Sequence, residues 1–238
     1  MEVLRLKIVQ ETAHFRIPTS GAPAPLLTYP LPPPSTVFGF LRRITKAPEI
    51  NYKHVALSIQ GRWSSISNDI ERLLFFEYGS QQKPGNILPD KTNVVKIHKL
   101  HECVWIIHIK STKDIIEQIE QAIKTYPHAF RLGRKEDLII DIEKTRVSLK
   151  NSNFDDKYDI NKDNYIYMPW KKTGKTDNLF RGNMYRAALD IIVKDGSIEE
   201  IVYIPLLFDS AEALEHNKEV FLDGEYPVVW LNDLSEWW

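Results

Sequence analysis

The sequence predicts an α+β fold in which four strands form one antiparallel sheet and two helices cover one face of it. Three observations lead to this prediction. Segments with alternating apolar residues, typical of strands, flank two segments whose apolar residues recur at helical spacing. The order strand, helix, strand occurs twice along the chain. Hydrophobic residues make up 43% of the 238 residues, which is enough to build a sizeable core.

The first strand-helix-strand unit is expected at about residues 4–63. Apolar residues alternate with Arg5 and Lys7 at its start, as in a strand with one buried face. A proline-rich stretch at 19–34 predicts an extended surface loop. A helix is expected at about 35–47, capped by Ser35 or Thr36 and ended by Pro48. The second strand is expected at about 55–61.

The second unit begins after an excursion at about 65–100, which fits no regular core element. Its polar, turn-rich composition suggests a protruding segment, for which a long hairpin is one form. A third strand is expected at 103–109, a helix at 112–126 capped by Ser111, and a fourth strand near 140–149. This double β-α-β order is that of ferredoxin-like (RRM-type) domains, which have both helices on one face and leave the other face free.

The composition changes after residue 150, so we expect a domain at 1–150 followed by a β-rich extension at 151–238. Residues 151–164 are rich in Asn, Asp and Lys, which favours a loop. Asp195 and Gly196 lie between two apolar segments and predict a tight hairpin turn. The extension is therefore expected to consist of strands and loops that cover or extend the sheet.

Charge and cysteine content restrict the classes of function. The 31 basic and 32 acidic residues give a formal net charge of −1, which argues mildly against a general nucleic-acid binder. Cys103 is the one cysteine, so an intrachain disulfide is excluded and a cysteine-based zinc site is not expected. The N-terminus has no signal-peptide pattern and no segment has the length of a membrane span. We expect a soluble intracellular protein.

The basic segment from Lys96 to His101 is a candidate phosphate-binding tract, because its cations alternate with apolar residues. An exposed edge strand protected by lysines has the same pattern. On a strand, Lys96 and His98 would share one side and Lys99 and His101 the other. His98 and His101 have no third zinc ligand nearby, so no metal and no cofactor is predicted.

Two further groups of cations are candidates for binding. Arg42 and Arg43 lie off the apolar stripe of the first predicted helix, and taken alone they are better explained as a solvated helix face. Arg131, Arg134 and Lys135 surround Gly133, between the second helix and the fourth strand. A glycine there allows positive φ and close approach of the backbone to a ligand, although an ordinary charged turn is the alternative.

Two segments resemble a known family. Residues Thr28–Gly39, with the sequence TYPLPPPSTVFG, resemble the N-terminal signature of the fifth CRISPR-associated (Cas) protein family. Residues Phe130–Asp137, with the sequence FRLGRKED, resemble the later Leu-Gly-Arg segment of that family. The first strand leading to Phe15, Arg16 and Ile17 also fits, and the resemblance covers about residues 1–150.

The resemblance implies a ferredoxin-like RAMP domain with a β-hairpin thumb at about 65–100. It implies a cytoplasmic prokaryotic subunit of the Cascade complex, most similar to type I-B members, that holds the 5′ handle of CRISPR RNA (crRNA). The implied partners are crRNA and the backbone and large subunits, with target DNA nearby and no membrane. The RNA-binding residues expected on this basis are Arg16, Arg42, Arg43, Lys96, His98, Arg131, Gly133, Arg134 and Lys135.

Two alternatives remain open. Type I-C members of the family cut precursor RNA without a metal by means of Tyr, Lys and His side chains. The conceivable counterparts in this sequence are Tyr29, Lys99, and His98 or His101, where a histidine would move protons and the lysine would stabilise the phosphorane. A ferredoxin-like domain that binds a small molecule is the third hypothesis, which no apolar-pocket pattern favours. We expect a non-catalytic RNA-binding subunit.

Overall fold

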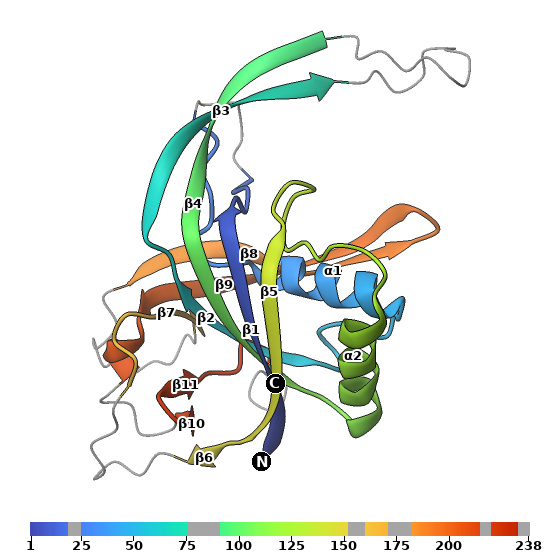
Figure 1. Ribbon diagram of the computed structural model, residues 1–238, viewed down its shortest axis with the longest axis vertical. Coiled ribbons are helices and arrows are strands. Elements are labelled where there is room, and N and C mark those ends of the chain that lie inside the picture. Colours follow the sequence, from blue (N-terminus) through green and yellow to red (C-terminus); the bar gives the residue numbers. More distant parts are fainter. Residues whose placement is uncertain (19–24, 76–90, 152–159, 171–181, 215–219, 233–238) are drawn as a thin grey trace.

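A computed structural model describes residues 1–18, 25–75, 91–151, 160–170, 182–214 and 220–232 (Figure 1). The elements in chain order are β1 (Glu2–Ala13), α1 (Pro34–Thr45), β2 (Ala56–Arg62), β3 (Ser65–Phe75), β4 (Lys91–Lys110), α2 (Lys113–Thr125), β5 (Ile139–Ser148), β6 (Lys150–Asn151), β7 (Tyr165–Pro169), β8 (Asn183–Lys194), β9 (Ser197–Ser210), the 3₁₀ helix η1 (Ala211–Leu214), β10 (Phe221–Asp223) and β11 (Tyr226–Val228). The molecule is a mixed fold, dominated by sheet, with two α-helices in the described residues.

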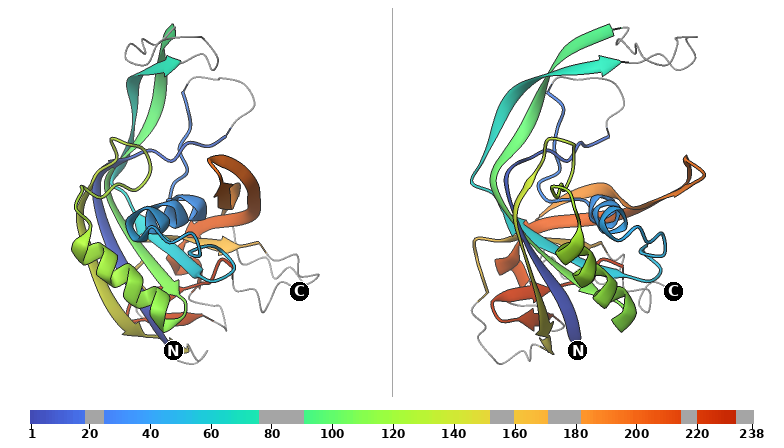
Figure 2. Two further views of the ribbon diagram at one scale, coloured as in Figure 1. Left: turned by 90° about the vertical axis from the view of Figure 1, so that its right-hand side faces the viewer. Right: turned by 45° about the vertical axis from the view of Figure 1, so that its right-hand side comes forward.

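The four predicted strands form the antiparallel array β5-β1-β4-β2. Helices α1 and α2 contact each other and lie on one face of this array (Figure 2). Their apolar side chains join the main core with the inward residues of the strands, such as Leu6, Ile107 and Ile59. Complete burial of each such side chain stabilises the fold by roughly 2 kcal/mol. The double β-α-β order expected from the sequence is therefore observed.

The excursion contains a long hairpin made of β3 and β4. Ser65 pairs with His101, and the ladder continues to the pair of Phe75 with Lys91. Strand β4 is 20 residues long, so its first half projects beyond the sheet while its second half lies at the centre of it (Figure 1). The expected third strand at 103–109 is thus only the C-terminal half of a longer element. Residues 76–90 between the two strands lie outside the described residues.

The extension continues the same sheet. Strand β7 pairs with β2, and β9 and β8 follow, which gives the order β5-β1-β4-β2-β7-β9-β8. The hairpin predicted around Asp195 and Gly196 is confirmed. Both residues have positive φ, 52° and 77°, as a two-residue turn between antiparallel strands requires. Residues 150 and 151, which the composition assigned to a loop boundary, form the short strand β6 instead.

The second face of the sheet is covered, and the expectation that it is free was wrong. Strands β6, β10 and β11 form a separate small sheet over it (Figure 1). Val3 of β1 is buried there with Leu149, Val228 and Trp230. Val3 lies on the same outward face of β1 as Arg5 and Lys7, which made this face look polar in the sequence. The residues that cover Val3 are far away along the chain, so the local pattern does not indicate them.

The helix starts also differ from the prediction. Helix α1 begins at Pro34 with Pro33 at its N-cap, and α2 has Thr112 at its N-cap, neither with a side-chain capping bond. A proline in the first turn needs no hydrogen-bond partner and has a helical φ, so α1 begins before Ser35. The Ser111 hydroxyl donates instead to the carbonyl of His54 at 2.8 Å.

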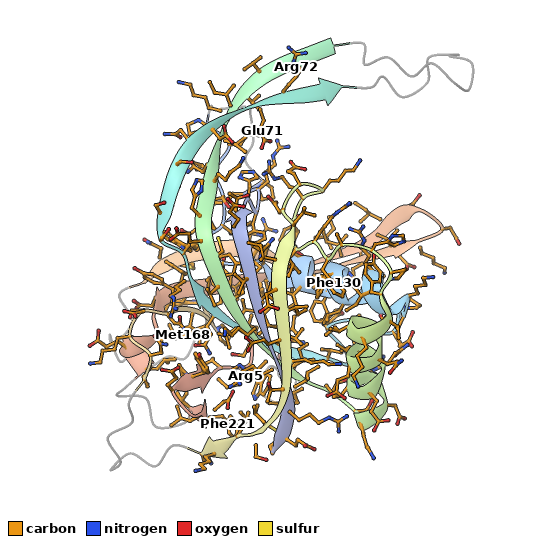
Figure 3. The ribbon with its side chains drawn as sticks, viewed as in Figure 1. Arg5, Glu71, Arg72, Phe130, Met168 and Phe221 are labelled. Carbon is orange, nitrogen blue, oxygen red and sulfur yellow. The ribbon has the colours of Figure 1, made fainter. Side chains whose placement is uncertain are left out.

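A partly buried polar cluster joins the small sheet to the main one. Arg5 on β1 and His108 on β4 are paired in the ladder, and both contact Asp223 of β10. The distances to Oδ2 of Asp223 are 2.7 Å from Arg5 Nη1 and 3.1 Å from His108 Nε2. Figure 3 labels Arg5 on β1 and Phe221 on β10, the strand that also carries Asp223. Burial lowers the pKa of His108, despite the neighbouring carboxylate of Asp223.

Candidate nucleic-acid interface

Four segments meet where the β3-β4 hairpin leaves the sheet, and we call this place the hairpin base. They are residues 14–16 after β1, residues 26–29 of the proline-rich segment, residues 96–99 of β4 and residues 131–137 after α2. Arg16 forms a bridge with Thr28, and Leu26 forms a bridge with Ile97. His14 Nδ1 lies 2.7 Å from the carbonyl oxygen of His98.

Phe15 connects the two segments that carry the family resemblance. Its backbone N–H donates to the Thr28 hydroxyl at 2.8 Å, and its carbonyl accepts from the N–H of Tyr29 at 2.7 Å. Its ring lies against Gly133, where an added Cβ would be 3.1 Å from the ring edge and 3.0 Å from Asp137 Oδ2. Gly133 has a φ of 106°. The glycine is therefore required by both backbone conformation and close packing.

Arg134 is held by carboxylates. Its guanidinium lies 2.6 Å from Glu71 Oε2 on β3, 3.2 Å from Glu136 Oε1 and 3.1 Å from Asp137 Oδ1, and Asp137 is fully buried. Burial acts to lower the pKa of Arg134, but the hydrogen bonds that Arg134 donates to Asp137 and Glu71 outweigh this effect and raise that pKa. This network fixes the 131–137 loop to the hairpin, so Arg134 is not an open cation.

Gln10 is a site residue that the sequence analysis missed. It is buried on β1, and its Nε2 donates to the carbonyls of Leu132 at 3.1 Å and Asp137 at 3.0 Å. Its Oε1 accepts from Trp105 Nε1 at 2.8 Å. The available signal was that Gln10 continues the inward alternation of Leu4, Leu6 and Ile8 along the first strand. Gln10 positions the loop from inside the core.

The basic tract is divided between the two faces of the hairpin, as its alternation predicts. Lys96 and His98 pair with Ile70 and Asn68 on one face, and Lys99 and His101 pair with Ser67 and Ser65 on the other. Lys99 forms ion pairs with Asp69 and Glu71, and His101 Nε2 lies 2.7 Å from the Ser67 hydroxyl. Their face is thus engaged in internal contacts.

The face that carries Lys96 is the more open one. Arg72 and Lys96 are exposed there, and His98 is half-buried. Figure 3 shows Arg72 on the projecting part of β3. Ile70 is 65% exposed and Val94 is 63% exposed on the same face, so apolar side chains lie beside the two cations. Arg72 is a further candidate that the sequence analysis did not single out.

The remaining predicted cations divide into two groups. Arg16 and Lys135 are exposed at the hairpin base, where Arg131 is half-buried. Within the described part of the chain, the buried Nε of Arg131 has no hydrogen-bond partner. Arg42 instead binds Asp190 of β8 at 2.8 Å, and Arg43 Nε donates to the Tyr126 hydroxyl at 3.2 Å. The contacts of these two arginines are thus with Tyr126 at the C-terminal end of α2, with β8, and with Ile50 in the loop after α1.

The residues of the possible cleavage site have separate partners. The Tyr29 hydroxyl donates to the carbonyl of Arg186 at 2.8 Å, and burial raises the pKa of Tyr29. The ammonium of Lys99 is bound to Asp69 and Glu71. Among the described residues, no hydrogen bond joins Tyr29 to His98, Lys99 or His101. Burial raises the pKa of the Cys103 thiol to about 12, which keeps it protonated.

The described ranges contain no group of three or more His, Cys, Asp or Glu side chains that could hold a metal ion. No helix among them has the length and apolar character needed to cross a membrane.

Solved structures share this fold. A chain described as "CRISPR RNA-guided surveillance complex" is 12% identical over 94% of this chain and 91% of its own, with a TM-score of 0.51. A second, described as "Crystal structure of Cas protein", is 10% identical over 92% of this chain and 100% of its own, with a TM-score of 0.50. No protein-family model matches the sequence. The curated proteins include no significant match either. At these identities, the likeness is one of fold.

Proposed function

We propose that this chain is a non-catalytic RNA-binding subunit of a CRISPR-Cas surveillance complex, which holds the 5′ handle of crRNA. In this proposal the β5-β1-β4-β2 half is a ferredoxin-like RAMP domain and the β3-β4 hairpin is its thumb. The chain bridges the backbone and large subunits, with target DNA nearby, in the cytoplasm of a prokaryote. The type I-B subtype is the closest in the style of its N-terminal motif.

The observation that carries the proposal is the convergence at Phe15. The proline-rich segment at 28–39 and the Leu-Gly-Arg segment at 130–137 are about a hundred residues apart in sequence. Both contact Phe15 at the hairpin base. Two short motifs that resemble the same family thus belong to one structural site, and the fold likeness to CRISPR-associated structures is independent support for this assignment.

The face of the hairpin that carries Arg72 and Lys96 is the proposed RNA contact, together with Arg16, Arg131 and Lys135 at the base. Phosphates need cations that are free to bind, and Arg16, Arg72, Lys96 and Lys135 are exposed. Arg134 and Gly133 contribute by shaping the loop. Arg42 and Arg43 support the fold through α1 and do not form part of the proposed contact.

Salt-dependent RNA binding tests this assignment. Replacement of both Arg72 and Lys96 with Ala should weaken binding to a 5′-handle RNA and lower the slope of log K against log salt. The slope should fall by about 0.7 for each lost phosphate contact on single-stranded RNA. Lys113→Ala on α2 is the control, because Lys113 is an exposed cation whose partner, Glu117, lies on the same helix. An unchanged slope in the double variant would remove the hairpin face from the RNA site.

A cleavage assay distinguishes the non-catalytic role from a metal-independent endoribonuclease. Parent protein and a Lys99→Ala variant are incubated with precursor repeat RNA in the presence of a chelator. Because Tyr29 and Lys99 have other partners, we expect intact RNA with both proteins. Specific cuts by the parent that disappear in the variant would establish the enzyme instead.

A further inference from the structure

The outer part of the β8-β9 hairpin forms an arm that projects from the sheet (Figures 1 and 2). One of its faces is turned toward the core: Ala187, Ile204 and Leu206 are buried there. Helix α1 fixes this face through the ion pair of Arg42 with the fully buried Asp190. The arm is thus anchored at its base.

The opposite face of the arm carries a continuous apolar strip. Val193 pairs with Ile198 and Ile191 pairs with Ile201, so the members of each pair share a face. Tyr203 follows Ile201 by two residues and has the same orientation. Val193 is 58% exposed, Ile198 62%, Ile201 38% and Tyr203 46%. We call Ile191, Val193, Ile198, Ile201 and Tyr203 the arm strip.

The arm strip continues a face that is covered elsewhere. Closer to β7, the same face of β9 carries Leu207, which is buried with Met168, Val220 and Leu222. The cover formed by the C-terminal segments therefore lies over the inner part of the hairpin, whereas the arm strip is exposed. Apolar side chains grouped on an open sheet face are a common mark of a protein contact.

The charges around the arm strip favour a protein over RNA. The turn and the adjoining strand carry Asp195, Glu199 and Glu200 against Lys194, all of them exposed. This segment has a local charge of −2 and would repel phosphates. The neighbouring Arg186 lies over the Tyr203 ring, with its guanidinium carbon 4.2 Å from the ring centroid. Its cation is thus stacked on one member of the arm strip.

We propose that the arm strip docks a neighbouring protein subunit of the complex, which presents an apolar patch bordered by basic side chains. The proposal rests on the assembly role given above and adds the surface that performs it. Apolar contact would provide most of the affinity, and the acidic residues would set the orientation and the rate of association.

The test uses the backbone and large subunits from the same CRISPR locus, purified and presented separately to this chain. A triple variant, Val193→Thr, Ile198→Thr and Ile201→Thr, keeps β-branched side chains and therefore the strands. We expect it to lose tenfold or more in affinity for one subunit, because three of the five apolar side chains of the arm strip then carry a hydroxyl group that the contact would desolvate. The control is Leu138→Thr with Ile140→Thr, which are exposed apolar positions beside and on β5.

A charge-reversal variant, Glu199→Lys with Glu200→Lys, should slow association with the same subunit, and added salt should reduce the difference from the parent. Handle RNA binding should stay unchanged in both variants, which separates this inference from the proposed function. Failure of the parent to bind handle RNA would reject the proposed function. If the parent binds RNA but neither subunit, or the triple variant docks as well as the parent, the docking proposal fails. Loss of RNA binding, or a parent dimer that the triple variant disrupts, would assign the strip to another occupant.

Discussion

Arg134 and Lys96 show how the cations of this chain divide between internal ion pairs and open surface. Both are in segments with an excess of positive charge, and the sequence assigned both to RNA. In the structure, Arg134 contacts three carboxylates while Lys96 is exposed. The carboxylate of Glu71 comes from a strand more than sixty residues earlier, which no local pattern can indicate.

Replacement of Arg134 with Ala should lower the free energy of unfolding by about 3 kcal/mol, because the fully buried Asp137 would lose its charged partner. Urea denaturation measures this change. Lys135→Ala, at the neighbouring exposed position, should change stability by less than about 0.5 kcal/mol. Equal stability of the two variants would mean that the Arg134 network contributes little to the fold.

Stability should also fall as the pH is lowered, because of His108. Burial lowers the pKa of His108 below that of a free histidine, about 6.5, so below that pH the unfolded chain binds more protons than the folded one. The folded state then loses stability progressively. His14, whose pKa is also lowered mainly by burial, contributes in the same direction. The effect is absent above about pH 7.

The contribution of His108 can be isolated by replacement with Gln, which keeps a donor for Asp223 but does not titrate. The difference in urea midpoint between pH 7.5 and pH 5.5 should be smaller in His108→Gln than in the parent. Arg5 and Asp223 are present beside position 108 in both proteins, so the effect of their charges is common to the two pH profiles. Identical pH profiles would show that His108 does not titrate differently in the folded and unfolded states.

At the scale of elements, two glycines have opposite roles that the structure separates. Gly39 lies on the exposed side of α1, where an added Cβ meets nothing within 4 Å. Gly61 on β2 has no room, because an added Cβ would lie 2.7 Å from the Trp105 ring and would also collide with the Val104 carbonyl. A sequence motif that includes Gly39 does not reveal this difference.

Gly39→Ala should therefore stabilise the protein by about 0.5–1 kcal/mol, since alanine loses less conformational freedom in a helix. Gly61→Ala should destabilise it by about 2–3 kcal/mol through overpacking against Trp105. Thermal denaturation of the two variants beside the parent tests both. A stable Gly61→Ala protein would contradict the packing of β2 on β4.

At the scale of the whole molecule, the sequence predicted what local periodicity determines. The two helices, the double β-α-β order and the turn at Asp195 and Gly196 all follow from patterns within a few residues. The cover over the second face does not, because Val3 meets Val228 and Trp230 from the far end of the chain. The contact of both motifs with Phe15 likewise depends on the tertiary structure, so the sequence did not predict it.

The position of the RNA is the most direct test of the proposed function. A crRNA with a photoreactive nucleotide in its 5′ handle is assembled with this chain and the partner subunits, irradiated and analysed by mass spectrometry of the cross-linked peptides. We predict cross-links to the β3-β4 hairpin and to the loop at 131–137. Handle cross-links confined to α2, or found only in other subunits, would contradict the proposal that this chain holds the 5′ handle.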